Sequence, residues 1–171
     1  MLTELLLEPE ENGLRFLRAG ATRYRCAIGK GGVSPGKREG DGATPVAVMA
    51  LRRLWWRRDR IAHVHCALPM SEITPDLGWC DDPGHASYNR PVPLPFAASH
   101  EKMCRDDGLY DLVVELGWND APPKPGHGSA IFMHIARENY GPTEGCIALA
   151  RDDLMALLSR VDANTLLTVR G

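Results

Sequence analysis

The stretch HIARENYGPTEGCIALARDDL, residues 134–154, joins the end of an apolar run, a tight turn and the start of a helix. His134 closes the apolar run, and Cys146 follows twelve positions later, directly after Gly145. A cysteine in this setting is a buried thiol, a metal ligand or a nucleophile whose base is the histidine. The surrounding sequence therefore has to distinguish three kinds of chemistry.

The segments on either side of this stretch have clear periodicities. SAIFMHIA, residues 129–136, is an apolar run typical of a buried strand. Residues 152–161 place Leu154, Leu157, Leu158 and Val161 at helical spacing, which predicts an amphipathic helix. His134 is therefore expected near the end of a strand, a rigid position for a general base.

Apolar and alternating runs predict further strands over residues 14–18, 22–28, 46–56, 60–68, 109–118 and 165–170. Residues 29–45 are rich in glycine and are predicted to form a long loop, and residues 69–95 are predicted to be mostly irregular. The sum is a mainly β fold, a sandwich or barrel with one or two helices. No linker or repeat divides the chain, so residues 1–171 are expected to form one domain.

Composition restricts the function. The formal net charge of -2 offers no basic surface for nucleic acid, and no apolar run is long enough for a membrane segment. The N-terminal residues MLTELLLEPE lack the basic start and the long apolar stretch of a secretory signal. Five cysteines without a C-x-x-C pair argue against a disulfide framework and a zinc ribbon. We expect a monomer without metal or cofactor.

The catalytic interpretation assigns a role to each residue of the turn. Cys146 is the nucleophile and His134 its base, which predicts that Cys146 alkylates faster at neutral pH than the other four cysteines. Gly145 lacks a side chain, so a substrate carbonyl has room to approach. The N–H groups of Gly145 and Cys146 are candidates for an oxyanion hole.

Together these residues resemble the catalytic motif of the L,D-transpeptidases with a YkuD domain. His134 matches the first histidine of the motif, and Thr143, Gly145, Cys146 and Ile147 match its second block. The upstream segment KREGDGATPVAVM, residues 37–49, resembles the strand entry that flanks the family's active site. The resemblance extends over residues 29–160 and implies a YkuD-like fold.

The resemblance implies acyl transfer between peptidoglycan stem peptides through a Cys146 thioester, with His134 as base and Thr143 positioning the loop. It also implies a periplasmic location. Glu144 and Ala148 replace the family's second histidine and its Asn or Arg, and the spacer after His134 is shorter than usual. These departures are typical of a compact, divergent branch, one of which is associated with 1,3-type L-alanine–diaminopimelate crosslinks rather than 3,3-type ones.

Several polar residues near the motif are candidates for substrate binding. They are Arg137, Tyr140, Glu144 and Arg151 beside the motif, and Asn89 and Arg90 in the irregular segment upstream. His63 and His65 of HVHC have metal-ligand spacing but no third ligand, so we expect them to face solvent. Two alternatives stay open: an L,D-carboxypeptidase or amidase using the same site, and a non-catalytic peptidoglycan-binding or metal-binding domain with a structural Cys146.

Overall fold

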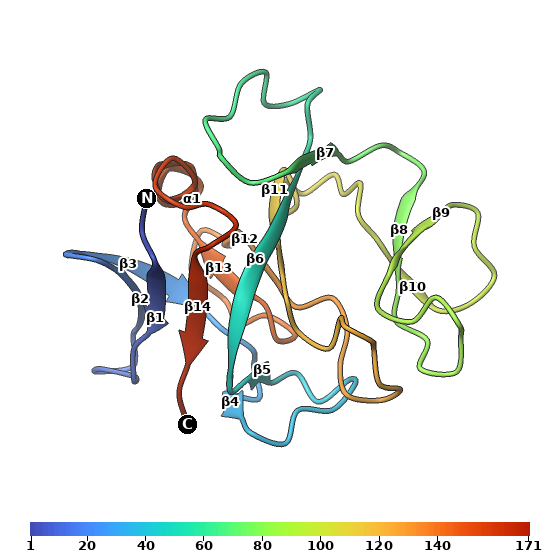
Figure 1. Ribbon diagram of the computed structural model, residues 1–171, viewed down its shortest axis with the longest axis horizontal. Coiled ribbons are helices and arrows are strands. Elements are labelled where there is room, and N and C mark those ends of the chain that lie inside the picture. The colour runs from blue at the N-terminus through green and yellow to red at the C-terminus, as the bar shows by residue number, and fades with distance from the viewer.

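The computed structural model describes residues 1–171 and shows a mainly β protein with one helix (Figure 1). The main sheet contains, in spatial order, β11 (Leu112–Leu116), β12 (Phe132–Ile135), β13 (Ile147–Leu149), β3 (Thr22–Ala27), β2 (Arg15–Ala19), β1 (Glu4–Leu7), β14 (Leu166–Val169), β6 (Ala47–Trp56) and β7 (Met70–Glu72). Strand β11 also pairs with β6, so the sheet closes on itself. The predicted mainly β sandwich or barrel with one or two helices is confirmed.

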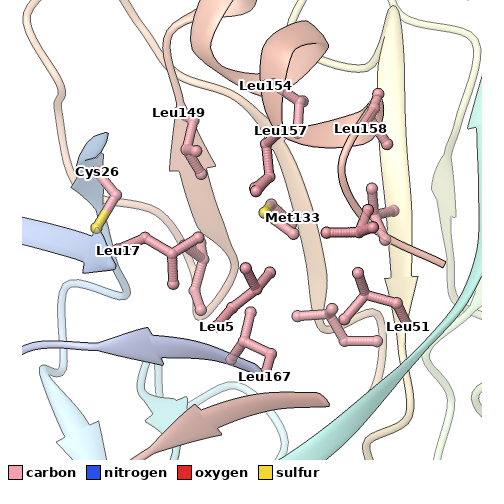
Figure 2. Close-up of a cluster of buried hydrophobic side chains, with 14 of the residues drawn as sticks. Leu5, Leu17, Cys26, Leu51, Met133, Leu149, Leu154, Leu157, Leu158 and Leu167 are labelled. Carbon is pink, nitrogen blue, oxygen red and sulfur yellow. The ribbon is translucent and has the colours of Figure 1, made fainter. Parts of the chain in front are cut away.

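The interior of the barrel is filled by one face of these strands. Met133 of β12 and Leu149 of β13 point inward together with the leucines of β1, β2, β6 and β14 (Figure 2). Helix α1 (Arg151–Leu158) adds its three buried leucines to the same core. A helix of this length is not stable alone, and burying each leucine contributes about 2 kcal/mol, so the core holds α1 in place.

The opposite face of β12 carries the residues that matter for the site. Because side chains alternate along a strand, Phe132 and His134 point away from the barrel interior that Met133 fills. A small sheet of β8 (Leu77–Cys80), β9 (Pro91–Pro93) and β10 (His100–Lys102) packs there. Its Trp79 meets the Phe132 ring edge-on, with centroids 5.0 Å apart. The site therefore lies between the barrel and this small sheet.

Most predicted elements are present, and one is wrong. The strands expected over 14–18, 22–28, 46–56, 109–118, 129–136 and 165–170, and the helix over 152–161, match β2, β3, β6, β11, β12, β14 and α1 to within a few residues. Residues 60–68 form a loop, not a strand, because β6 is already paired with β14, β7 and β11 along its length. The segment expected to be irregular over 69–95 contains β7, β8 and β9.

Candidate active site

His134 and Cys146 come from two neighbouring parallel strands. In the register of β12 and β13, His134 lies opposite Ala148, and Cys146 directly precedes β13. Alternation along β13 places Cys146 and Ala148 on the same outward face as His134. All three residues line one cleft of about 460 Å³. The predicted nucleophile and base are thus brought to one site by the sheet register.

The thiol of Cys146 is protonated at rest. Its side chain is only 7% exposed; its Sγ accepts the Phe132 N–H at 3.4 Å and donates to the Ala130 carbonyl oxygen at 3.3 Å. Burial raises the pKa of the Cys146 thiol to about 12. The expectation that Cys146 alkylates fastest at neutral pH stays a prediction; burial also raises the pKa of Cys26 to about 12.

His134 is neutral and held in one tautomer. It is 6% exposed, and burial lowers its pKa to about 4. Its Nδ1 lies 2.9 Å from the Ile135 carbonyl oxygen, which can only accept, so Nδ1 carries the proton. Nε2 is left as the proton acceptor. A backbone carbonyl therefore orients the imidazole, a partner that no sequence pattern reveals.

Gly145 is required by backbone packing. Its φ is +135°, and a Cβ there would lie 2.8 Å from the Ala43 carbonyl oxygen. The Thr44 hydroxyl donates to the Gly145 carbonyl at 2.9 Å and accepts the Gly29 N–H at 3.0 Å. The expected room for a substrate carbonyl at Gly145 is thus filled by the loop of residues 42–44. Through this contact the GDGATP segment, residues 40–45, packs against the turn that leads into Cys146.

Only one of the two expected oxyanion donors is available. The Gly145 N–H donates to the Thr143 hydroxyl at 3.1 Å, and that hydroxyl donates to the Cys146 carbonyl at 2.6 Å. The Cys146 N–H forms no hydrogen bond in the structure. Thr143 thus fixes the turn, while the N–H of Cys146 faces no protein acceptor.

Two of the predicted binding residues reach the cleft. Arg137 lines it as an exposed side chain on the loop after β12 and forms no ion pair. Glu144 lines it at the rim, where its carboxylate binds Lys30 Nζ at 2.8 Å. Arg137 is therefore the free cation nearest to the base along the chain.

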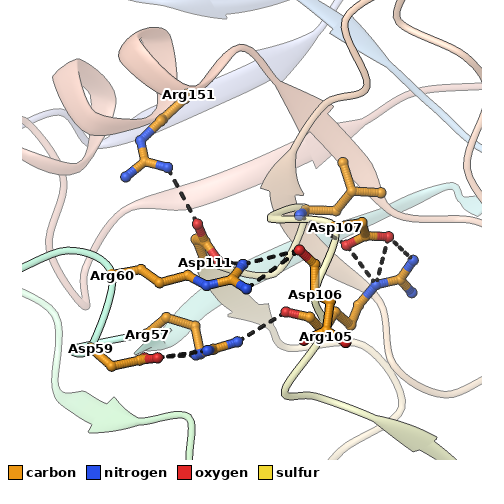
Figure 3. Close-up of polar contacts among 9 residues, drawn as sticks. Arg57, Asp59, Arg60, Arg105, Asp106, Asp107, Asp111 and Arg151 are labelled. Carbon is orange, nitrogen blue, oxygen red and sulfur yellow. Dashed lines mark hydrogen bonds and ion pairs between the residues drawn. The ribbon is translucent and has the colours of Figure 1, made fainter.

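The other predicted binding residues lie outside the cleft lining. The Arg25 guanidinium covers the ring of Tyr140 at 4.2 Å, beside a neighbouring pocket. Arg151 binds Asp111 at 3.3 Å, within the cluster of arginines and aspartates in Figure 3. Arg90 donates to the Asp120 carbonyl at 2.6 Å. Their contacts are structural, as are those of Asn89.

Asn89 is buried beneath the site and not in it. Its Oδ1 accepts the Trp79 indole N–H and the Ala130 N–H, each at 3.0 Å. Its Nδ2 donates to the carbonyls of Trp118 and Asn119. Because the Ala130 carbonyl accepts a hydrogen bond from the thiol of Cys146, Asn89 supports the backbone that holds this thiol.

The cleft also contains residues that sequence patterns missed. The rings of Tyr110 and His134 pack edge to face with centroids 5.1 Å apart, and the Tyr110 hydroxyl donates to Glu101 at 2.5 Å. Glu39 and Ser129 line the same cleft. These side chains come from four separate segments, so no local motif could have identified them. His63 and His65 are exposed on the 60–68 loop, as predicted.

A buried thiol, a neutral imidazole and a backbone N–H without a protein acceptor share one cleft, and these are groups that cysteine acyl transfer uses. A family model described as YkuD, L,D-transpeptidase catalytic domain, matches residues 8–169, and the chain belongs to that family. Membership associates it with L,D-transpeptidase chemistry and with peptidoglycan. No curated protein and no solved structure matches it significantly. None of its helices has the length and apolar character that crossing a membrane needs.

The neutral His134 predicts a loss of stability in acid. Its pKa is about 4 in the folded chain and 6.5 in an ordinary setting, so the unfolded chain binds the proton more readily. The stability that this difference contributes is complete above about pH 6.5 and is lost as the pH falls to 4. We expect His134 alone to lower the free energy of unfolding by roughly 3 kcal/mol between pH 7 and 4.

Urea titrations of the wild type and of His134→Gln at both pH values measure this effect. The variant should lose roughly 3 kcal/mol less than the wild type over that range, because glutamine does not titrate. Equal losses in the two proteins would show that His134 is not buried in its neutral form.

Proposed function

We propose that this protein is an L,D-transpeptidase that crosslinks peptidoglycan stem peptides through a thioester on Cys146. The observation that carries the proposal is the placement of the thiol and the neutral imidazole on one face of β12 and β13, in one cleft. Membership of the L,D-transpeptidase family supports the choice of substrate. The protein would act as a monomer on the periplasmic side, where peptidoglycan is assembled.

The first half-reaction forms the thioester. Cys146 Sγ attacks a stem-peptide carbonyl while His134 Nε2 takes the thiol proton, so no free thiolate is needed beforehand. The N–H of Cys146 donates to the developing oxyanion. The C–N bond then breaks, and His134 returns the proton to the leaving amine. Arg137, the exposed cation at the cleft, would bind a carboxylate of the donor peptide.

The second half-reaction decides the product. An amine of a neighbouring diaminopimelate would attack the thioester, form the new amide bond and release the Cys146 thiol. The crosslink would be of the 3,3-type or the 1,3-type, according to which donor carbonyl the cleft accepts. Attack by water at the same thioester would instead make the protein an L,D-carboxypeptidase or amidase.

Incubation with purified disaccharide-peptides, followed by mass spectrometry of protein and products, tests this proposal. We expect an acyl adduct on Cys146 and crosslinked dimers that have lost the leaving amino acid. Shortened monomers without dimers would identify a hydrolase. The absence of both adduct and products would identify a non-catalytic domain and overturn the proposal.

A further inference from the structure

The cleft contains three carboxylates, and two of them have no cationic partner in the protein. Glu39, Asp81 and Glu101 line it, and neither Glu39 nor Asp81 forms an ion pair. Glu39 accepts a hydrogen bond from the uncharged Tyr88 hydroxyl. The cation nearest to Glu101 is Arg105, at 3.9 Å. The negative charge on this side of the cleft thus exceeds what its neighbours balance.

The cations nearby are bound to other carboxylates. Arg105 binds Asp107 at 2.5 Å, as Figure 3 shows, and Lys37 binds Asp41. Arg137, the other cation of the cleft, lies on the loop after β12, next to the base. The cleft therefore has one free cation on that loop and unpaired acids on the side of the small sheet and the 37–43 loop.

Two buried polar atoms at the cleft have no partner. They are Asp81 Oδ1 and Ser129 Oγ, and Ser129 is only 8% exposed. Buried polar atoms in proteins nearly always have a hydrogen-bond partner, because burying one without compensation costs about 1–3 kcal/mol. A carboxylate oxygen can only accept, and a hydroxyl can accept, so a ligand with several N–H donors satisfies both.

Ser129 and Glu101 are connected to the Cys146 sulfur and to His134 through neighbouring residues. Ser129 directly precedes Ala130, whose carbonyl accepts the Cys146 thiol. Glu101 binds the hydroxyl of Tyr110, whose ring contacts His134. Burial, followed by the charges of Asp81 and Glu39, raises the pKa of the Glu101 carboxyl. Glu101 is thus a stronger proton acceptor than an ordinary glutamate.

We propose that Glu39, Asp81 and Glu101, with the Ser129 hydroxyl, bind the ammonium group of the amine that accepts the acyl group from Cys146. This inference rests on the proposed transpeptidase function and assigns its acceptor site. Three carboxylates and a hydroxyl supply the acceptors that an ammonium with three N–H donors requires. Water has no charge for them to attract, so the site favours aminolysis of the thioester over hydrolysis.

The proton balance of the second half-reaction follows from this placement. The bound ammonium gives one proton to the Glu101 carboxylate and becomes a neutral amine. Its nitrogen attacks the thioester carbonyl, the C–N bond forms and the C–S bond breaks. The second proton passes through His134 Nε2 to the sulfur and restores the Cys146 thiol. Glu101 then releases its proton to solvent.

Acceptor binding to the full chain carrying Cys146→Ser tests the site without turnover. The probes are a disaccharide-tripeptide ending in diaminopimelate and the same molecule acetylated on its side-chain amine. Isothermal titration calorimetry should show the amine form binding at least tenfold more tightly. Asp81→Asn and Glu39→Gln in that background should each weaken binding of the amine form about tenfold and leave the acetylated form unchanged.

Asp106→Asn is the matched control, since Asp106 is exposed and its carboxylate forms no hydrogen bond or ion pair. It should change neither affinity. Equal binding of the two probes, or variants that weaken both probes alike, would overturn the proposal. The measurement needs no acyl transfer, so a binding preference without dimer formation would count against the transpeptidase and not against the ammonium site.

Discussion

Replacement of Cys146 by alanine is expected to lower the rate of stem-peptide crosslinking by on the order of a thousandfold or more, the effect of removing a covalent nucleophile. No other cysteine lines the cleft, so none can take over the attack. Mass spectrometry should detect no acyl adduct on the variant. Product analysis by chromatography gives the rate of crosslinking directly.

Cys146→Ser separates chemistry from structure. The serine hydroxyl can still accept the Phe132 N–H and donate to the Ala130 carbonyl, so the fold around the site should be kept. The less acidic hydroxyl should form no adduct with the neutral His134. Cys66→Ala, at a half-buried thiol outside the cleft, should crosslink at the wild-type rate. Crosslinking by Cys146→Ala at a rate near that of the wild type would contradict the nucleophile assignment.

Strands with a local signal could be predicted from the sequence, and strands that depend on distant partners could not. The apolar runs of β11 and β12 and the leucine spacing of α1 indicate directly which residues are buried. Strand β1 has four residues and exists because it pairs in parallel with β14 at the other end of the chain. The short strands β8 and β10 likewise depend on pairing with each other. Such pairings leave no periodicity in a three- or four-residue segment.

The placement of Cys146 and His134 in one cleft could be predicted, because the proposed chemistry requires these residue types in one motif. The direction in which a side chain points could not be predicted from the motif. Arg151 and Tyr140 are near Cys146 and His134 in sequence, yet their contacts with Asp111 and Arg25 keep them out of the cleft. Glu101 is distant in sequence and reaches the cleft because the small sheet packs on the barrel. Tertiary packing, which selects these residues, is not encoded in the motif.

Asn89→Ala is expected to lower the free energy of unfolding by about 4 kcal/mol, since buried hydrogen-bonded groups left unpaired cost about 1–3 kcal/mol each. Asn89 is 4% exposed and has a φ of +56°, which asparagine tolerates better than alanine. The variant leaves the N–H groups of Trp79 and Ala130 and the carbonyls of Trp118 and Asn119 without their partner. Urea titration measures the loss.

The same variant should also lower crosslinking by the protein that remains folded, because the Ala130 backbone loses the hydrogen bond that fixes it beside the Cys146 thiol. A substrate-binding residue would behave differently, raising KM at unchanged stability. Asn164→Ala is the matched control, since Asn164 is exposed and its side chain forms no hydrogen bond; the change should stay within about 0.5 kcal/mol. An Asn89→Ala protein that is as stable as this control, with only its KM raised, would show that Asn89 binds substrate, as its sequence context predicts.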